Sequence, residues 1–298
     1  MKSFTNLRNL YGTLTLDASA TNLTLGDQLI NDEIRHICAL QDFPWTHKAR
    51  TMTTTASTQF KALPFDIDLV ESVFVTVSSQ RYVPKLIHSR EQWDILNRSN
   101  YTSDYPEYAL VYNGELGLWP IPATSSNVIT VNGKLRVIDL NTADDTARTI
   151  TTLANGSNAL TVSAGLTAQH PGFFIRPTFS TTANTGDGNW YEIATVTGAT
   201  TGTLVRLYGG NSIAAGTAAC TISQMPILPE DFHDLPVFKA AETYWNMEGN
   251  FVKAATFAKA YSEGLQTLVN QYKSPISDLV IDDGSREDFI NPNILISI

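Results

Sequence analysis

Few residues of this chain have the type and spacing that chemistry requires. The histidines occur singly, and none belongs to a His-x-x-x-His unit or stands near a Cys-x-x-Cys pair, the spacings typical of zinc sites. The five are His36, His47, His88, His170 and His233. Their distribution along the sequence does not favour a metal centre.

Neighbouring carboxylates are a second kind of candidate, because two of them can ligate a metal or act as an acid/base pair. The pairs are Asp66 with Asp68, Asp144 with Asp145, and Asp282 with Asp283. None has the Asp-x-Asp-x-Asp-Gly pattern of a calcium loop, and carboxylates in a polar turn are ordinarily solvated. We interpret all three pairs as surface turns.

Phosphate-binding and nucleophile motifs are missing as well. The segment 209–212, Gly-Gly-Asn-Ser, is followed by no Lys-Ser/Thr pair, and no Gly-x-Ser-x-Gly elbow occurs. Cys38 and Cys220 fall on an expected helix face and an expected strand, so we predict two buried thiols. The sequence therefore offers no catalytic residue, no metal ligand and no cofactor site, and we predict a protein that is not an enzyme.

Aromatic residues in a strand-rich segment offer one further binding chemistry. Phe173, Phe174, Trp190 and Tyr191 could form a platform for a sugar ring. Alternation along a strand places Trp190 and Tyr191 on opposite faces, so at least one of them is expected in a core. A carbohydrate-binding module stays open as an alternative.

Two helical segments flank the chain. From Thr24 to Leu40 the apolar residues recur on one helix face while acidic and basic residues fall on the other, and a weaker apolar pattern between Leu7 and Leu14 indicates a short helix or an arm. After Leu228, Asp234 offers an N-cap, Pro236 falls in a first turn, and Gly249 has the position that closes a helix. The apolar residues of the second run are Phe251, Ala255, Ala258, Tyr261, Leu265, Leu268 and Tyr272. We predict an antiparallel helical pair that ends before Pro275.

Between these helices the pattern favours strands. In the region 49–147 we expect strands at 51–56, 70–77 and 128–137, a short helix at 89–97 capped by Ser89, and a hairpin around Asn113-Gly114. In the region 148–224 we expect five short strands separated by glycine turns, which indicates a small barrel or sandwich inserted between chain of another type. Those strands are at 160–163, 173–176, 190–196, 203–208 and 220–223.

The last residues, 274–298, have no helical period yet are rich in apolar side chains. So many large apolar groups in water would cost about 1.5–3 kcal/mol for each that could be buried. We predict an extended tail that docks on a partner, with folding back on its own subunit as the alternative. The predicted docking residues are Leu279, Val280, Ile281, Phe289, Ile290, Ile294, Leu295 and Ile296.

Composition narrows the class of protein. Charged residues make up only 16% of the chain, which suggests a surface largely covered by neighbours, and the net charge of −9 argues against a protein that coats DNA. No run approaches the roughly 20 apolar residues of a membrane span, and Met1 to Thr5 lacks the apolar stretch of a signal peptide. We expect a chain made in the cytoplasm, with no membrane segment.

Four stretches resemble the head-to-tail adaptor, or connector, proteins of tailed bacteriophages. Asn22–Arg35 is similar to their first helix, Trp93–Arg98 followed by Tyr105–Tyr108 to a mid-chain element, and Leu116–Pro122 to the strand and turn after it. The fourth is Met225–His233 with the helical pair that follows. These signatures concern packing and turns, so they carry over an architecture and no catalytic residue. The segment 148–224 departs from the smallest adaptors, which run almost directly from a β region to the terminal helices.

The resemblance and the patterns together predict an α+β chain with five parts. These are an N-terminal helical segment (1–48), a mixed β region (49–147), an inserted β domain (148–224), a C-terminal helical pair (225–273) and a docking tail (274–298). The N-terminal and C-terminal helices are expected to form one bundle.

The resemblance also implies a role. It implies a structural virion protein of the neck, made in the host bacterium, that forms a ring, by analogy a dodecamer, between portal and tail. Its expected partners are the portal, a tail nozzle or tail tube protein, and double-stranded DNA that passes through a central channel without sequence-specific binding. Another neck or tail component, such as a nozzle or tail-completion protein, stays open as an alternative, whereas a hydrolase is disfavoured.

Overall fold

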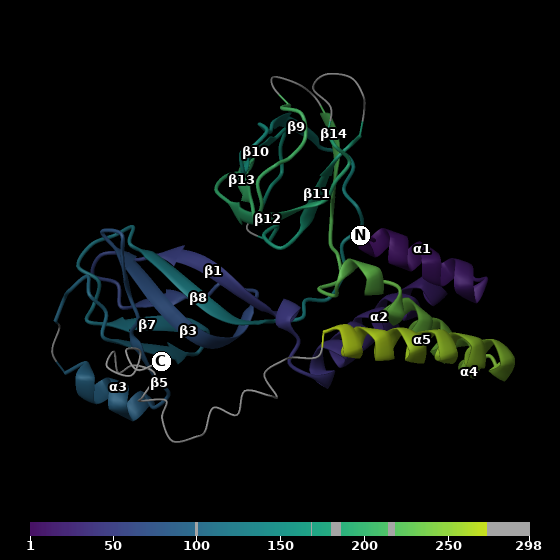
Figure 1. The fold of residues 1–298 in the computed structure, drawn as a ribbon, viewed down its shortest axis with the longest axis horizontal. Coiled ribbons are helices and arrows are strands. Elements are labelled where there is room, and N and C mark those ends of the chain that lie inside the picture. Colours follow the sequence, from purple (N-terminus) through teal and green to yellow (C-terminus); the bar gives the residue numbers. More distant parts are fainter. Residues whose placement is uncertain (99–100, 168, 180–185, 214–217, 273–298) are drawn as a thin grey trace, which may run out of the picture.

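The computed structural model describes residues 1–98, 101–167, 169–179, 186–213 and 218–272, which form a helical bundle, a pair of sheets and a small barrel (Figure 1). The chain is therefore of the predicted α+β class, with its first and last described helices packed together. The predicted division into five parts remains a prediction, and the tail 274–298 lies outside the described residues.

The N-terminal helices are α1 (Phe4–Thr15) and α2 (Ala20–Leu40). Both begin at a serine, because the hydroxyl of Ser3 accepts from the Asn6 N–H and that of Ser19 from the Asn22 N–H. The helix predicted from Thr24 thus starts four residues earlier. The weak pattern near Leu7 belongs to a regular helix and not to an arm.

The C-terminal pair is α4 (Leu235–Met247) and α5 (Phe251–Gln271), joined at Gly249, whose φ of +70° suits the glycine that ends a helix. Asp234 has the N-cap position of α4, but its carboxylate binds the ammonium of Lys2 and does not cap the helix. A short 3₁₀ turn at Glu230–Phe232 precedes α4.

These four helices share one core, to which both ends of the chain contribute. Its fully buried members include Leu7, Tyr11, Ile34, Ile37 and Val237. Figure 1 shows α1 along one side of the bundle and α5 along the other. The burial of α5 differs from expectation, because Phe251 and Ala255 are exposed.

The buried seam of α5 consists of Ala254, Tyr261 and Leu268, which are spaced by seven residues. Seven residues make close to two helical turns, so these three lie on one line of α5. Leu265 and Val269 are partly buried beside that line, and the face opposite it stays open. The predicted set of apolar residues covered a wider stripe of the helix. Apolar spacing alone does not show how far the neighbouring helices extend along α5, so it predicted too much burial.

The mid-chain region forms two four-stranded sheets whose inner faces share a core. The first has the order β1-β8-β3-β4 and the second β2-β7-β6-β5. Their bounds are β1 His47–Thr53, β2 Phe60–Ala62, β3 Ile67–Val77, β4 Gln80–Tyr82, β5 Lys85–Ile87, β6 Tyr108–Tyr112, β7 Glu115–Trp119 and β8 Val128–Leu135. A 3₁₀ turn at Pro44–Thr46 leads into β1.

Two local predictions for this region are confirmed. β6 and β7 form the hairpin, with Asn113 at φ +52° and Gly114 at φ +77°, as a type I′ turn requires. Helix α3 (Arg90–Leu96) begins at Ser89, whose hydroxyl accepts from the Gln92 N–H. Three short strands, β2, β4 and β5, were not expected from the sequence.

The third unit is a closed six-stranded barrel in the order β10-β13-β12-β11-β14-β9. Its strands are β9 Thr149–Thr152, β10 Ala159–Val162, β11 Phe174–Pro177, β12 Tyr191–Val196, β13 Thr201–Leu204 and β14 Ala218–Ser223. The prediction of five strands was wrong by one: it missed β9, a run of threonines with one isoleucine that pairs with β10 and β14 and completes the barrel. The fourth expected strand also begins earlier, at Thr201.

Candidate functional site

None of the predicted docking residues can be placed, because all eight lie outside the described residues. They are Leu279, Val280, Ile281, Phe289, Ile290, Ile294, Leu295 and Ile296. The candidate sites below lie on the described surface.

The groups that could do chemistry stay apart in the structure. Within the described ranges no cluster of three His, Cys, Asp or Glu side chains could hold a metal ion. His233 is buried, with Nδ1 facing the Lys2 backbone and Nε2 3.0 Å from the Leu228 carbonyl, so it ties the chain's start to the α4 entry. Burial lowers the pKa of His233, which favours its neutral form.

The two cysteines are buried and unbonded, as predicted. Burial raises the pKa of Cys38 to about 12 and that of Cys220 to about 12. A thiol acts as a nucleophile in its thiolate form, so neither cysteine has the properties of a reactive site.

The aromatic platform on the barrel is not formed by the central pair. Both Trp190 and Tyr191 are buried, at 9% and 3% exposure. The Tyr191 hydroxyl donates to Asp187 at 2.5 Å, and Arg176 stacks over the Trp190 ring. These two side chains stabilise the barrel and do not themselves offer a flat face to a sugar, whereas Phe173 and Phe174 are half-buried.

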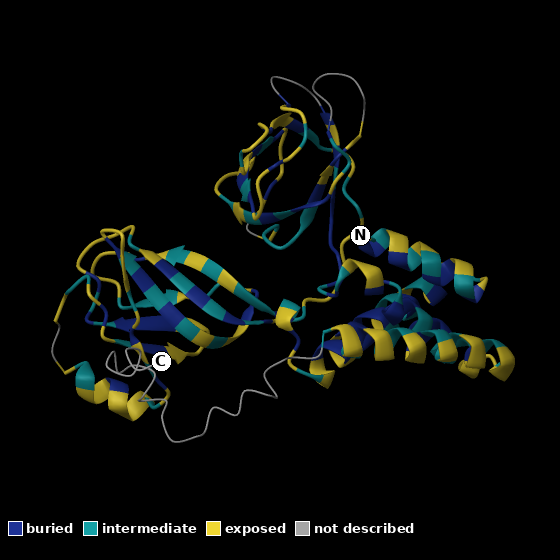
Figure 2. Cartoon of the chain, viewed as in Figure 1, coloured by how far each residue is buried: buried dark blue, intermediate teal, exposed yellow. Residues whose placement is uncertain are grey.

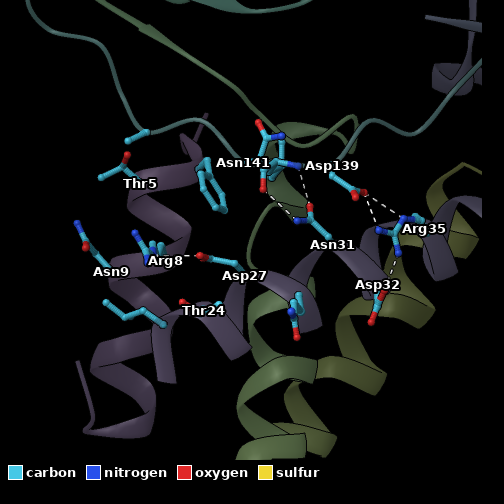
Figure 3. A pocket seen from close by; sticks show the side chains of 15 residues that line it. Thr5, Arg8, Asn9, Thr24, Asp27, Asn31, Asp32, Arg35, Asp139 and Asn141 are labelled. Atoms are coloured by element: carbon cyan, nitrogen blue, oxygen red, sulfur yellow. Dashed lines mark hydrogen bonds and ion pairs between the residues drawn. The ribbon is translucent and has the colours of Figure 1, made fainter. Parts of the chain in front are cut away.

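A groove of about 710 Å³ lies between α1, α2 and the segment 139–143 (Figure 3). Most of its side chains carry hydrogen-bonding groups that point into the opening from the two helices. The lining residues are Phe4, Thr5, Arg8, Asn9, Leu23, Thr24, Asp27, Gln28, Asn31, Asp32, Arg35, Asp139, Leu140, Asn141 and Ala143.

The floor of this groove is fixed by one amide. The Asn31 side chain donates to the Leu140 carbonyl at 3.0 Å and accepts from the Leu140 N–H at 2.8 Å. Both bonds are buried, so the pair orders the segment that follows β8 against α2. At the rim, the Arg35 guanidinium donates to Asp139 at 2.7 Å and to Asp32 at 2.5 Å.

Inside the groove, Arg8 and Asp27 are incompletely paired. Their closest approach is 3.3 Å, and neither Arg8 Nε nor Asp27 Oδ1 has a hydrogen-bond partner among the described residues although both atoms are buried. Burial raises the pKa of Asp27, and the Arg8 charge offsets part of that effect. The remaining parts of the Arg8 and Asp27 side chains, which are 35% and 23% exposed, make this groove suited to a polar neighbour.

The outer face of α5 is the complementary open surface, on the other side of the bundle (Figure 1). It lies opposite the buried seam and is exposed along its whole length (Figure 2). Its side chains are hydrogen-bonding groups with one ion pair, Lys259 with Glu263 at 3.8 Å. The face comprises Thr256, Lys259, Glu263, Gln266, Thr267 and Asn270.

A buried charge cluster joins the first sheet to the barrel. The Arg50 guanidinium on β1 lies 2.6 Å from Asp66 and 3.1 Å from Glu192 on β12, and Lys48 lies 2.8 Å from Glu192. The side chains of Arg50, Asp66 and Glu192 are 15%, 10% and 13% exposed. The cluster thus connects the two β units through ion pairs.

Sequence reasoning missed both the groove and the charge cluster. The interpretation of Asp66 as part of a solvated turn was wrong, because its carboxylate is buried against Arg50. The polar residues of the groove recur at helical spacing in α1 and α2. Such a pattern ordinarily indicates a helix face that is exposed to solvent. Only the position of 139–143 over α2 makes it concave. Likewise Arg50 and Glu192 are separated by 142 residues, so no spacing rule connects them.

None of the helices in the described part of the chain is long and apolar enough to cross a membrane. The described residues form a helical bundle, a pair of sheets and a barrel, which together define a protein of the α+β class. A model of the SU10 adaptor protein family matches residues 3–164, from α1 through β10.

Because the match spans more than half of the chain, the protein belongs to the SU10 adaptor family. It is thus a structural phage adaptor protein, a component of the virion that binds other virion proteins. No curated protein matches the chain.

Proposed function

We propose that this adaptor forms a ring, by analogy a dodecamer, between the portal and the tail, with a central channel through which DNA passes. Support comes from family membership and from two open surfaces on opposite sides of one helical bundle. Different surfaces that meet head to tail generate a closed ring when the rotation between subunits closes.

In this proposal the outer face of α5 of one subunit lies in the α1–α2 groove of the next. Both surfaces are polar, and α5 brings donors and acceptors such as Gln266 and Asn270 toward the incompletely paired Arg8 and Asp27. The single observation that carries the proposal is the seam of α5, because a 21-residue helix with three buried residues exposes more surface than its own bundle uses.

The tail supplies the contact with the portal. Residues 274–298 combine two apolar runs with five acidic residues and one arginine, a composition that suits an apolar groove with basic margins on another protein. The excess of acidic residues in the whole chain, 29 against 20 basic residues, favours a lumen that repels DNA and lets it slide. The tail nozzle or tail tube protein would bind the opposite end of the ring.

The test is assembly on purified portal, followed by mass photometry and negative-stain imaging. The full-length chain should form a ring with a DNA-wide channel on the portal. Gln28→Arg in the groove and Gln266→Arg on α5 should each prevent ring closure while leaving the subunit folded, since both side chains are exposed. Thr200→Arg on an exposed barrel loop is the matched control and should assemble normally.

Two results would refute the proposal. A chain that never associates with portal or virions is not the adaptor proposed, and rings that form equally well with both arginine variants exclude the α5–groove interface. Truncation after Lys273 should abolish portal binding without unfolding the bundle, and normal binding by that truncated chain would exclude the tail contact.

A further inference from the structure

The second mid-chain sheet ends at an open edge beside an apolar groove. β5 pairs with β6 on one side only, and the described residues place no strand on its other side. The Lys85 N–H donates to the backbone carbonyl of Glu107, so it faces β6. Successive residues of a strand alternate in direction, and the N–H and C=O of Leu86 therefore face the open edge. Leu86 therefore presents a backbone donor and a backbone acceptor for a further strand.

The groove next to this edge has a volume of about 610 Å³ and is lined mainly by apolar surface from β5, α3 and β6. Ile95 on α3 is 55% exposed there and adds to the apolar surface of the groove. The groove is lined by Lys85, Leu86, Ile87, His88, Ser89, Gln92, Ile95, Leu96 and Tyr108. An unpaired edge strand beside exposed apolar surface can bind a further extended segment as an added strand.

We propose that, in the adaptor free of portal, residues 294–298 of the same chain add to the edge of β5 and cover this groove. The segment Ile-Leu-Ile-Ser-Ile is free of proline and charge and is rich in β-branched residues, the composition of a strand. Its alternate residues Ile294, Ile296 and Ile298 share one face, which matches the apolar floor formed by Leu86, Ile95 and Leu96.

The length of the connecting chain permits this. Figure 1 shows that α5 ends at the side of the bundle facing the mid-chain sheets. Residues 273–293 lie between that end and the segment, and an extended chain spans about 3.3–3.6 Å per residue. Glu287 and Asp288 precede the segment and would lie toward the basic margin that Lys85 and His88 give the groove. The portal would then compete with β5 for the same apolar tail.

Cross-linking in the full-length chain tests this placement. Gln92→Cys on the exposed face of α3 is combined with Ser297→Cys, and a short bis-maleimide reagent is added; the native Cys38 and Cys220 are buried and unreactive. The expected product is a cross-link within one chain. The control pair, Ala154→Cys on an exposed barrel loop with Ser297→Cys, should give little product. Hydrogen exchange should also show protection of the Leu86 amide.

Ile95→Glu should lower the cross-link yield roughly tenfold or more, because the lost burial of one large apolar side chain changes an equilibrium constant by about that factor. Ile95→Ala is the milder companion and should have an intermediate effect. Equal product from the control pair, or an unprotected Leu86 amide, would overturn the proposal. Cross-links found only between chains would overturn it too, and would assign the groove to a neighbouring copy. The portal contact is tested separately and does not depend on this result.

Discussion

The hydroxyl of Tyr261 on α5 donates a hydrogen bond to the carboxylate of Glu33 on α2, inside the helical core. The two residues are 228 positions apart, and Glu33 is only 7% exposed. Burial raises the pKa of Glu33, and the bond from Tyr261 offsets part of the effect. Lys239 of α4, which lies over the Tyr261 ring, contributes in the same direction as that bond. One acidic group in the core thus links both ends of the chain.

This pair predicts a pH dependence of stability. Because the folded state holds the Glu33 proton more tightly than the unfolded state, its contribution is most favourable below the unfolded pKa and is lost as pH rises through the folded pKa. Glu33→Gln should remove this loss, so the variant should be more stable relative to the wild type at pH 7 than at pH 4. Urea unfolding at several pH values measures this. A constant difference between the two proteins would contradict the assignment.

Removing Arg50 from the charge cluster should strongly lower the free energy of unfolding. Arg50→Ala leaves Asp66 and Glu192 as buried carboxylates without their guanidinium, a change that typically costs about 3–5 kcal/mol. Denaturant unfolding gives the energy, and small-angle scattering should show a wider spread of angles between barrel and sheet. Arg136→Ala is the control. Arg136 and Asp68 form an exposed ion pair, so removing it should change the free energy of unfolding by no more than about 0.5 kcal/mol.

Gly26 should tolerate no side chain. A Cβ at this position of α2 would lie 2.3 Å from Cδ1 of Tyr11, whose ring is buried and cannot swing away. Gly26→Ala should therefore destabilise the bundle by about 1–3 kcal/mol, despite the higher helix propensity of alanine. Gly12→Ala is the matched control, since its Cβ would meet the flexible end of Leu23 at 3.2 Å and Ala18 at an ordinary contact distance of 3.7 Å. Thermal unfolding followed by circular dichroism at 222 nm would measure both changes. Equal melting temperatures for the two variants would show that the Tyr11 ring does not prevent a side chain at position 26.

The barrel should be removable without unfolding the helices. β9 and β14 are paired neighbours, and Asp145 bridges to Ile222, so the chain enters and leaves the barrel at one place. Ser223 and Gln224 belong with the bundle, because the Ser223 hydroxyl donates to Asp144 and the Gln224 carbonyl accepts from the Phe4 N–H. Replacing residues 149–219 by a short Gly-Ser linker should preserve the helical circular dichroism signal and a cooperative transition. Loss of that transition would show that the barrel is part of the common core.

In a ring, the same barrel is expected on the outer rim, as an inserted domain whose ends meet at the surface. Electron microscopy of rings made from the shortened chain should then show a smaller outer diameter and an unchanged channel. A changed channel would place the barrel at the lumen instead.

The sequence by itself determined most of the local structure. Caps such as Ser89, the Asn113-Gly114 turn and the apolar period of α2 act over a few residues, so short-range patterns were sufficient to predict them. The α+β class and the pairing of the terminal helices followed from the same patterns together with the resemblance to phage adaptors. Elements without a strong local pattern, such as β9 and the short strands β2, β4 and β5, were missed because their partners define them.

Only the tertiary structure decided where the surfaces for other proteins lie. The α1–α2 groove exists because Asn31 holds Leu140, Arg50 connects the first sheet to the barrel through Glu192, and one face of α5 stays open because its buried residues lie on the opposite side. Each of these contacts joins residues that are far apart in the chain. Long-range hydrogen bonds and ion pairs of this kind produce no periodic pattern in the sequence, so they could not be predicted from it. Contacts across space, and not composition, give this adaptor its interfaces.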